Sequence, residues 1–211
     1  MALKTLEELT GRRNAWPRVQ GWIQQAGKRV ETLPADSQSS ASTLLALQIS
    51  TATPLGALAY HSGGLLVDSG WLRILGCGHE RMHWGLAEWN GLQADHDVPV
   101  PDRLIVAHDV LGGFFGRERN KRISYYSPDT QHWEDTRLGY NDWLAWALSE
   151  DMGDFYENLR WRGWSKEVKE LEPHQGLLVE PLLWKKGPPL SKRKRTPVPI
   201  VELWGKYQSG R

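Results

Sequence analysis

The chain has 211 residues, of which 40% are hydrophobic and 24% charged, and its 26 basic and 25 acidic side chains leave a formal net charge of +1. This composition excludes a disordered chain, and the balanced charge excludes a general attraction to nucleic acid or to an anionic membrane. The single cysteine, Cys77, excludes an intramolecular disulfide, and no segment reaches the ~18 apolar residues of a membrane span. We therefore expect a cytoplasmic protein that forms a single domain over residues 1–211.

Residues 1–54 are predicted to be mainly helical. Thr5 and Glu8 have the spacing of a capping box, in which two side chains bind the free backbone groups of the first helical turn. Asn14 and Gly27 are residue types favoured at the start and at the end of a second helix. This part of the chain therefore contributes mainly helices to the domain.

Residues 55–139 are predicted to form a meander of strands. Short apolar runs at 55–61, 65–68 and 71–75 are separated by serine and glycine, which favour tight turns between antiparallel strands. Two further strands flank the charged turn at 119–121. We therefore expect successive strands to pair as hairpins.

Residues 140–172 carry the clearest helical pattern, and residues 173–211 form a C-terminal extension with a basic, proline-rich loop. The basic run at 191–195 lacks interleaved aromatic residues, which favours a solvated loop over a nucleic-acid patch. Strands and helices are clustered along the chain and do not strictly alternate. This pattern predicts an α+β fold with a mainly antiparallel sheet and helices packed on one face.

The segment VAHDVLGGFFG is predicted to be a bend between two strands. Asp109 can bind its own backbone two residues on, and the pair of glycines that follows allows a tight turn. Because successive side chains of a strand point to opposite faces, we expect Phe114 or Phe115, but not both, to face the core. Asp109 is thus interpreted as a turn residue, and it is kept as a candidate binding residue because loops also carry binding sites.

Tryptophan is the unusual residue of this chain, with 12 among 211 residues. Each ring buries a large area and carries one N–H group that needs a partner. One interpretation is that the tryptophans fill a core that has only three phenylalanines, and the other is that some form an aromatic binding surface. Trp133 and Trp143 join Asp109 as the candidate binding residues.

The segment CGHERMH contains the candidate metal ligands Cys77, His79 and His83, because thiolate and imidazole groups bind zinc. Its spacing matches no recognised zinc motif. A fourth ligand would come from His61, Asp95 or His96. The alternative is a polar loop in which Cys77 is a small apolar residue, and on this interpretation we expect neither a metal nor another cofactor. The phosphate-binding, dinucleotide-binding and nucleophile-elbow motifs are also missing, so no catalytic residue is predicted.

Four segments of the chain occur in an order typical of one protein family. They are LGALAYHSGGLLVDSGWLRILG, VAHDVLGGFFG, YYSPDTQHWEDTRLGYNDWLAWAL and FYENLRWRGW. On these segments, the chain from about Leu55 to Trp204 resembles an uncharacterised bacterial family, domain of unknown function 2625. This resemblance implies no established activity, ligand or catalytic residue.

A second resemblance covers less of the chain. The segment VAHDVLGGFFG, followed by an aromatic strand and the helix YNDWLAWAL, looks like the core of the SUKH superfamily. That resemblance implies an α+β domain that presents a binding surface, and many such domains act as immunity proteins that neutralise toxins. With the missing catalytic motifs, it predicts a non-enzymatic module of immunity-protein type that binds a protein partner. The alternative is a small hydrolase or a metal-dependent enzyme that uses Cys77, His79 and His83.

Overall fold

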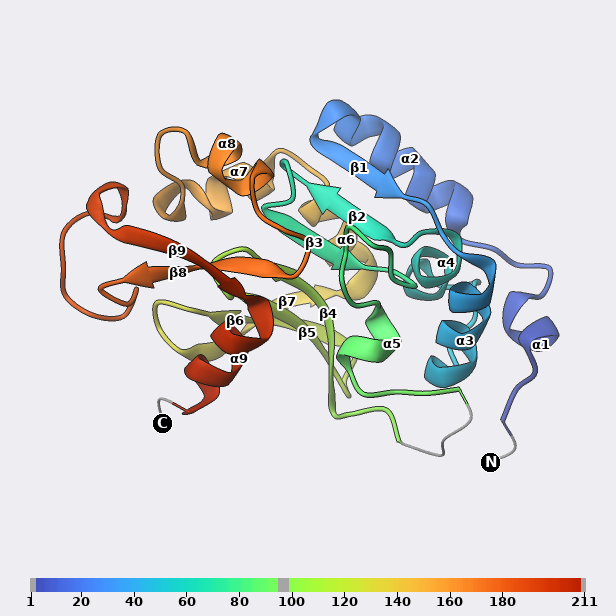
Figure 1. Ribbon diagram of the computed structural model, residues 1–211. Helices are drawn as coiled ribbons and strands as arrows, with labels where there is room; N and C mark the ends of the chain where they lie inside the picture. Colours follow the sequence, from blue (N-terminus) through green and yellow to red (C-terminus); the bar gives the residue numbers. More distant parts are fainter. Residues whose placement is uncertain (1–2, 95–98, 210–211) are drawn as a thin grey trace.

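The computed structural model describes residues 3–94 and 99–209, and an antiparallel sheet of seven strands lies at its centre (Figure 1). The strands lie side by side in the order of the chain, and each pairs with the next, as an antiparallel arrangement allows without crossover connections. The predicted α+β class with a mainly antiparallel sheet is confirmed. The strands are β1 (Val30–Leu33), β2 (Gly64–Val67), β3 (Leu72–Leu75), β4 (Arg103–Asp109), β5 (Phe114–Glu118), β6 (Arg122–Ser127) and β7 (His132–Gly139).

The helices of the described residues precede, interrupt and follow this sheet. The first begins at the predicted capping box, in which the hydroxyl of Thr5 accepts the N–H of Glu8 and the carboxylate of Glu8 accepts the N–H of Thr5. The α-helices are α1 (Leu6–Thr10), α2 (Trp16–Ala26), α3 (Ser37–Leu47), α4 (Pro54–His61), α5 (Leu86–Trp89), α6 (Tyr140–Ala147), α7 (Asp151–Phe155), α8 (Trp164–Lys169) and α9 (Ile200–Ser209). Single 3-10 turns lie at Gly27–Arg29, Glu157–Leu159 and Leu190–Lys192.

Residues 55–61, which were predicted to be a strand, belong to helix α4. The hydroxyl of Thr53 accepts the N–H of Gly56, and Pro54 lies at the first helical position, where an N–H group is not needed. Nearly all of this helix is buried. A short run that is apolar on all sides shows neither the helical nor the strand periodicity of polar residues. Its capping residues are the signal that favours a helix.

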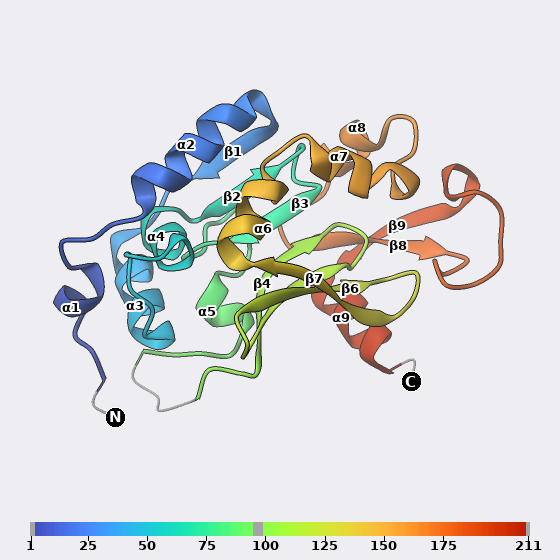
Figure 2. The ribbon, with the colours of Figure 1, turned by 180° about the vertical axis from the view of Figure 1, so that it is seen from behind.

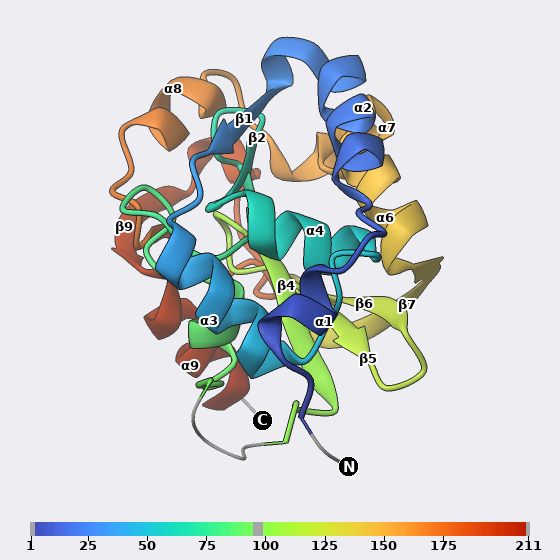
Figure 3. The ribbon, with the colours of Figure 1, turned by 90° about the vertical axis from the view of Figure 1, so that its right-hand side faces the viewer.

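Helices cover both faces of the sheet, as the side view in Figure 3 shows, whereas the sequence predicted helices on one face only. Phe114 packs against Trp204 of α9 on one face, and Phe115 packs against Trp143 of α6 on the other face, which Figure 2 shows with α4 and α6 in front. Both phenylalanines are 0% exposed, so the prediction that only one of them faces the core is wrong. Alternation does send the two rings to opposite faces, but α9 covers the second face.

The C-terminal extension forms a second, two-stranded antiparallel sheet from β8 (Gln175–Glu180) and β9 (Lys194–Pro199). Part of the segment predicted to be a basic loop is therefore a strand. Its arginine Arg195 forms an ion pair with Glu167 of α8 at 2.9 Å, which explains how a basic run can pair as a strand. The N–H of Leu177 donates to the carbonyl oxygen of Val110 and thereby attaches this hairpin to the end of β4.

Candidate functional site

Asp109 is a fully buried carboxylate that binds four donors at the end of β4. Its Oδ1 accepts the backbone N–H groups of Leu111 and Gly113, both at 2.9 Å. Its Oδ2 accepts the hydroxyl groups of Tyr125 at 2.9 Å and Tyr156 at 3.0 Å. Burial raises the pKa of Asp109, while these hydrogen bonds favour the ionised form. The side chain thus shapes the predicted turn and also connects it to a strand and to the end of α7.

Trp143, the second candidate binding residue, lies in the core. Its side chain is fully buried, and its ring centroid lies 5.2 Å from that of Phe115 and 5.5 Å from that of Tyr140. This placement corresponds to the first of the two interpretations of the tryptophans, in which the rings fill the interior. A partner at the surface would not reach this ring in the structure as it stands.

The three candidate metal ligands border one open pocket next to α3, but each has its own surroundings. The buried thiol of Cys77 accepts a hydrogen bond from the hydroxyl of Ser40 at 3.5 Å. His79 accepts the N–H of Arg81 through Nδ1. The ring of His83 stacks on that of the neighbouring tryptophan at 5.1 Å.

Within residues 3–94 and 99–209, no group of three or more histidine, cysteine or acidic side chains is placed to hold a metal ion. His61, one of the side chains considered as a fourth ligand, contacts Asn14 through Nε2 at 2.8 Å and stacks on Trp16. Asp95 and His96, the other two, lie outside the described residues. The structure therefore brings together no metal site from the candidates that it describes.

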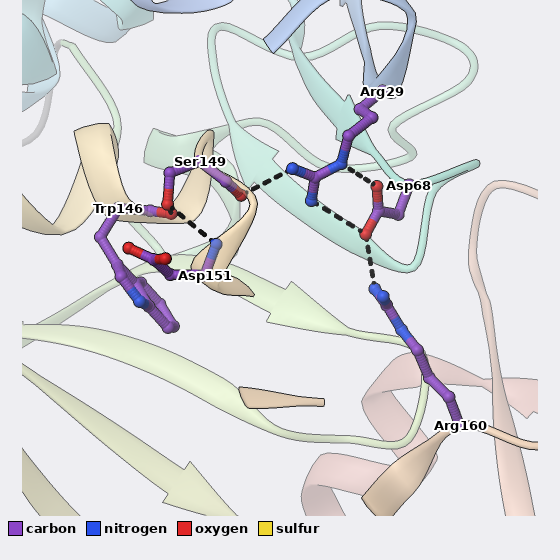
Figure 4. Close-up of polar contacts among 6 residues, drawn as sticks. All are labelled: Arg29, Asp68, Trp146, Ser149, Asp151 and Arg160. Atoms are coloured by element: carbon purple, nitrogen blue, oxygen red, sulfur yellow. Dashed lines mark hydrogen bonds and ion pairs between the residues drawn. The ribbon is translucent and has the colours of Figure 1, made fainter. Parts of the chain in front are cut away.

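A cluster of ion pairs joins three parts of the chain at the turn between β2 and β3 (Figure 4). Asp68 pairs with Arg29 at 2.9 Å and with Arg160 at 2.7 Å, and Arg29 also donates to the carbonyl oxygen of Ser149. Burial alone would raise the pKa of Asp68, but hydrogen bonds from the two arginines lower it. Because each charge has an opposite charge beside it, the cluster fits a role in holding the fold together.

Trp133 is the candidate residue that lies at the surface. Its ring is partly buried, and the guanidinium of Arg103 lies 3.8 Å from the ring centroid, which is the geometry of a cation–π contact. A shallow pocket surrounds the pair on β4, β5, β6 and β7. We call its lining the Trp133 surface, which consists of Asp102, Arg103, Glu118, Arg119, Asn120, Arg122, Ser124, Trp133 and Asp135.

Charged side chains of both signs border the pocket. Arg103 pairs with Glu118, Arg119 with Asp102, and Arg122 with Asp135. The pairs Arg119–Asp102 and Arg122–Asp135 are largely exposed, and exposed pairs contribute only about 0–1 kcal/mol each to stability. The sequence indicated Trp133 alone, because its neighbour Arg103 lies thirty residues earlier in the chain. A signal that was present is the dense charge of the adjoining segment RERNKR.

Strand β7, which carries Trp133, lies at the edge of the seven-stranded sheet. It pairs with β6 from His132 to Asp135, and the pairing is then interrupted by a bulge in which Arg137 adopts a φ of +63°. An edge strand presents backbone N–H and C=O groups on its outer side, where an extended segment of another chain can pair. Because of the bulge, such a segment would pair with the part of β7 next to Trp133.

None of the helices in the described residues combines the length and the apolar character needed to cross a bilayer.

Comparison with known proteins identifies relatives that span nearly the whole chain. The chain is 36% identical over 198 residues to the uncharacterized protein YbfG of Escherichia coli K12, covering 90% of this chain and 89% of that protein. It is 35% identical over 187 residues to an uncharacterized protein of Haemophilus influenzae, covering 85% of this chain and 82% of that protein.

No solved structure matches the chain, so the likeness to the SUKH fold stays a prediction. The model of one protein family matches residues 6–203, which include both sheets and both the buried and the exposed candidate residues. The earlier resemblance to that family is confirmed. The chain belongs to the family described as protein of unknown function DUF2625.

Proposed function

We propose that this protein is a non-enzymatic binding module, of the type to which immunity proteins belong, and that it binds a protein partner through the Trp133 surface. The observation that carries the proposal is the stacked pair of Trp133 and Arg103 in a pocket beside an edge strand. Tryptophan and arginine are the side chains most enriched among the residues that dominate binding energy in protein interfaces.

The surroundings of this pair fit a protein partner better than a small molecule. The pocket is shallow and is bordered by charged side chains, whereas small-molecule sites are usually concave and mostly apolar. Its three ion pairs present both signs of charge, which suits a partner with complementary charges at the rim of an interface. The edge strand β7 adds backbone donors and acceptors for an extended segment.

The test begins with capture of partners by the tagged protein from a lysate of its source organism, with quantitative mass spectrometry. A protein that the unaltered chain retains is then purified, and its binding is measured by isothermal titration calorimetry. Trp133→Ala is expected to weaken the affinity by roughly 30-fold or more, which corresponds to about 2 kcal/mol at a dominant interface residue.

Trp22→Ala is the matched control. Trp22 is also partly buried and also has an arginine, Arg18, over its ring at 5.0 Å, but it lies on helix α2, away from the Trp133 surface. This variant should bind as the unaltered chain does, within about 3-fold, since a residue outside an interface contributes little. Equal affinity of the Trp133→Ala variant, with an unchanged thermal melt, would contradict the proposed surface.

A further inference from the structure

Arg73 is a charged side chain in the middle of the buried strand β3. It is 4% exposed, and its partners across the neighbouring strands are Leu66 and His108, which are both buried. Its Nη1 donates to the carbonyl oxygen of Pro173, one hundred residues away in the chain. Within the described part of the chain, no carboxylate forms an ion pair with this guanidinium.

A buried arginine without a counter-ion is unusual, because charged side chains are almost never fully buried unless they are paired. Burial lowers the pKa of Arg73 to about 10, so the side chain still carries its charge at neutral pH. Arg29 and Arg160 show the usual solution, since both are paired with Asp68. Arg73 has five N–H donors, and a single carbonyl oxygen does not neutralise its charge.

The side chain borders a pocket of about 480 Å³ that lies between the turn from β2 to β3, helix α8 and the segment leading to β8. Two more basic side chains, Arg81 and Lys169, border the same pocket. Of its acidic side chains, Glu31 is already paired with Arg81. Glu172 is exposed and forms no ion pair within the described residues. The pocket therefore keeps an excess of positive charge.

The groups near Arg73 on the other side are also basic. The rings of His83 and His174 lie 5.5 Å apart, and His108 is the partner of Arg73 on β4. Burial lowers the pKa of both His83 and His108, and the charge of Arg73 lowers them further. Glu88 acts in the opposite direction on His83. None of these histidines can therefore provide the negative charge that Arg73 lacks.

We propose that the pocket bordered by Arg73 and Lys169 binds a small molecule through a carboxylate or phosphate group. The planar guanidinium can donate two parallel hydrogen bonds to either group, and the ammonium of Lys169 supplies a second positive charge. This site is separate from the Trp133 surface, and it stands or fails independently of the proposed protein partner.

The test measures binding of inorganic phosphate and of malonate to the full chain by isothermal titration calorimetry, with sodium chloride at matched ionic strength as the reference. One of the two anions is expected to bind with 1:1 stoichiometry. Arg73→Gln should weaken this binding at least 10-fold, and Lys169→Ala should weaken it about 3-fold, because an exposed ammonium contributes less than a buried guanidinium.

Arg117→Gln is the matched control, since Arg117 is a partly buried arginine of the same sheet that, like Arg73, forms no ion pair within the described residues, and it borders a different pocket. This variant should keep the full affinity. Equal loss in both variants, or no saturable binding of either anion to the unaltered chain, would overturn the proposal.

A readout on the unaltered chain covers the case in which Arg73→Gln does not fold. In the NMR spectrum, the side-chain Nε–H signal of Arg73 should shift with the anion concentration and reach a plateau, while that of Arg117 stays in place. If the Arg73 signal is insensitive to both anions, the arginine serves only to bind the carbonyl oxygen of Pro173, and the proposed site does not exist.

Discussion

Asp109 and Arg73 are both buried charges on neighbouring strands of one sheet, but their surroundings differ. Asp109 lies on the face covered by α6 and α7 and accepts four hydrogen bonds from within the chain. Arg73 lies on the face that carries α5 and donates to one carbonyl oxygen. Two of the Asp109 donors are backbone N–H groups of its own turn, whereas the acceptor of Arg73 comes from the distant C-terminal extension.

The fold itself provides Asp109 with all the hydrogen-bond partners that it needs, whereas it provides Arg73 with one neutral acceptor and no opposite charge. A buried carboxylate with four donors needs no further partner, because hydrogen bonds compensate the loss of water. A buried guanidinium with one neutral acceptor retains most of its cost of desolvation. We therefore expect substitutions at Asp109 to affect stability strongly, and substitutions at Arg73 to affect binding more than stability.

The largest effect is expected for Asp109→Ala. The change removes the acceptor of two backbone N–H groups and of the hydroxyls of Tyr125 and Tyr156, and all four donors remain buried. We expect the free energy of unfolding to fall by about 4 kcal/mol, since each unsatisfied buried donor costs roughly 1–3 kcal/mol. Urea denaturation measures this loss, and a loss below about 1 kcal/mol would mean that water replaces the carboxylate.

Gly113→Ala tests whether the same turn has room for a side chain at the glycine. A Cβ atom at this position would lie 2.1 Å from Oδ2 of Asp109 and 2.3 Å from the hydroxyl of Tyr125. We expect a loss of about 3 kcal/mol, because the methyl group must displace the hydrogen bond between these two side chains. Gly153→Ala in α7 is the control, since no atom lies within 4 Å of its added Cβ and alanine favours the helix. Similar melts of the two variants would show that the turn can shift.

The sequence predicted this turn because its signals are local. Asp109 is followed by two glycines, and the structure places the positive φ at the first of them, Gly112, with +82°. Local signals also predicted the capping box of α1. They did not separate a buried helix from a strand at α4, where an apolar run has no polar face.

The missing parts of the prediction depend on contacts between distant segments. Arg73 stands in the run WLRIL as a lone charge, which is a signal that could have been noticed. Its acceptor at Pro173 and the neighbouring His174 could not be assigned to it, because they lie about a hundred residues away in the chain. Trp133 was a candidate from the sequence, but the pocket and the arginine over its ring came from the pairing of β4, β5, β6 and β7.

Asp109→Asn separates the stabilising effect of the backbone hydrogen bonds in the turn from that of the hydrogen bonds with the two tyrosine hydroxyls. Asparagine can still accept the backbone N–H groups through its carbonyl oxygen, but an amide nitrogen replaces the oxygen that receives the hydroxyls of Tyr125 and Tyr156. We expect a loss of about 2 kcal/mol, larger than the small effect that turn chemistry alone predicts. Asp36→Asn is the control, because both residue types cap helix α3 equally well. Equal thermal melts of both variants would show that the hydroxyls reorient without loss.

His108→Phe tests the basic surroundings of Arg73, because His108 should make the free energy of unfolding depend on pH. Burial, with a contribution from Arg73, lowers the pKa of His108 to about 3, whereas a histidine in the unfolded chain titrates near 6.5. Between these values the unfolded state binds one more proton, so the free energy of unfolding falls as the pH falls. From pH 7 to pH 5 this group accounts for about 2 kcal/mol of the loss.

The variant should therefore lose about 2 kcal/mol less than the unaltered chain over that interval. Phenylalanine keeps an aromatic ring beside Trp89 and Phe114, on which His108 packs. Urea denaturation at pH 7 and pH 5 gives the difference between the two chains, in which the other histidines cancel. Identical pH dependence would show that His108 takes up its proton in the folded state.

Arg73→Met is expected to have the smallest effect on stability, and it contrasts most directly with Asp109→Ala. Methionine has a length similar to that of the arginine stem and can fill the same space beside Leu66 and His108. The change removes a buried charge together with its hydrogen bond to the carbonyl oxygen of Pro173. Replacing a buried charge by an apolar side chain of similar volume is often neutral or stabilising. We therefore expect the free energy of unfolding to change by no more than about 1 kcal/mol, in either direction.

If the variant instead loses as much stability as Asp109→Ala in the same urea titration, Arg73 is a structural residue whose charge the fold satisfies. The contrast between the two buried charges would then disappear.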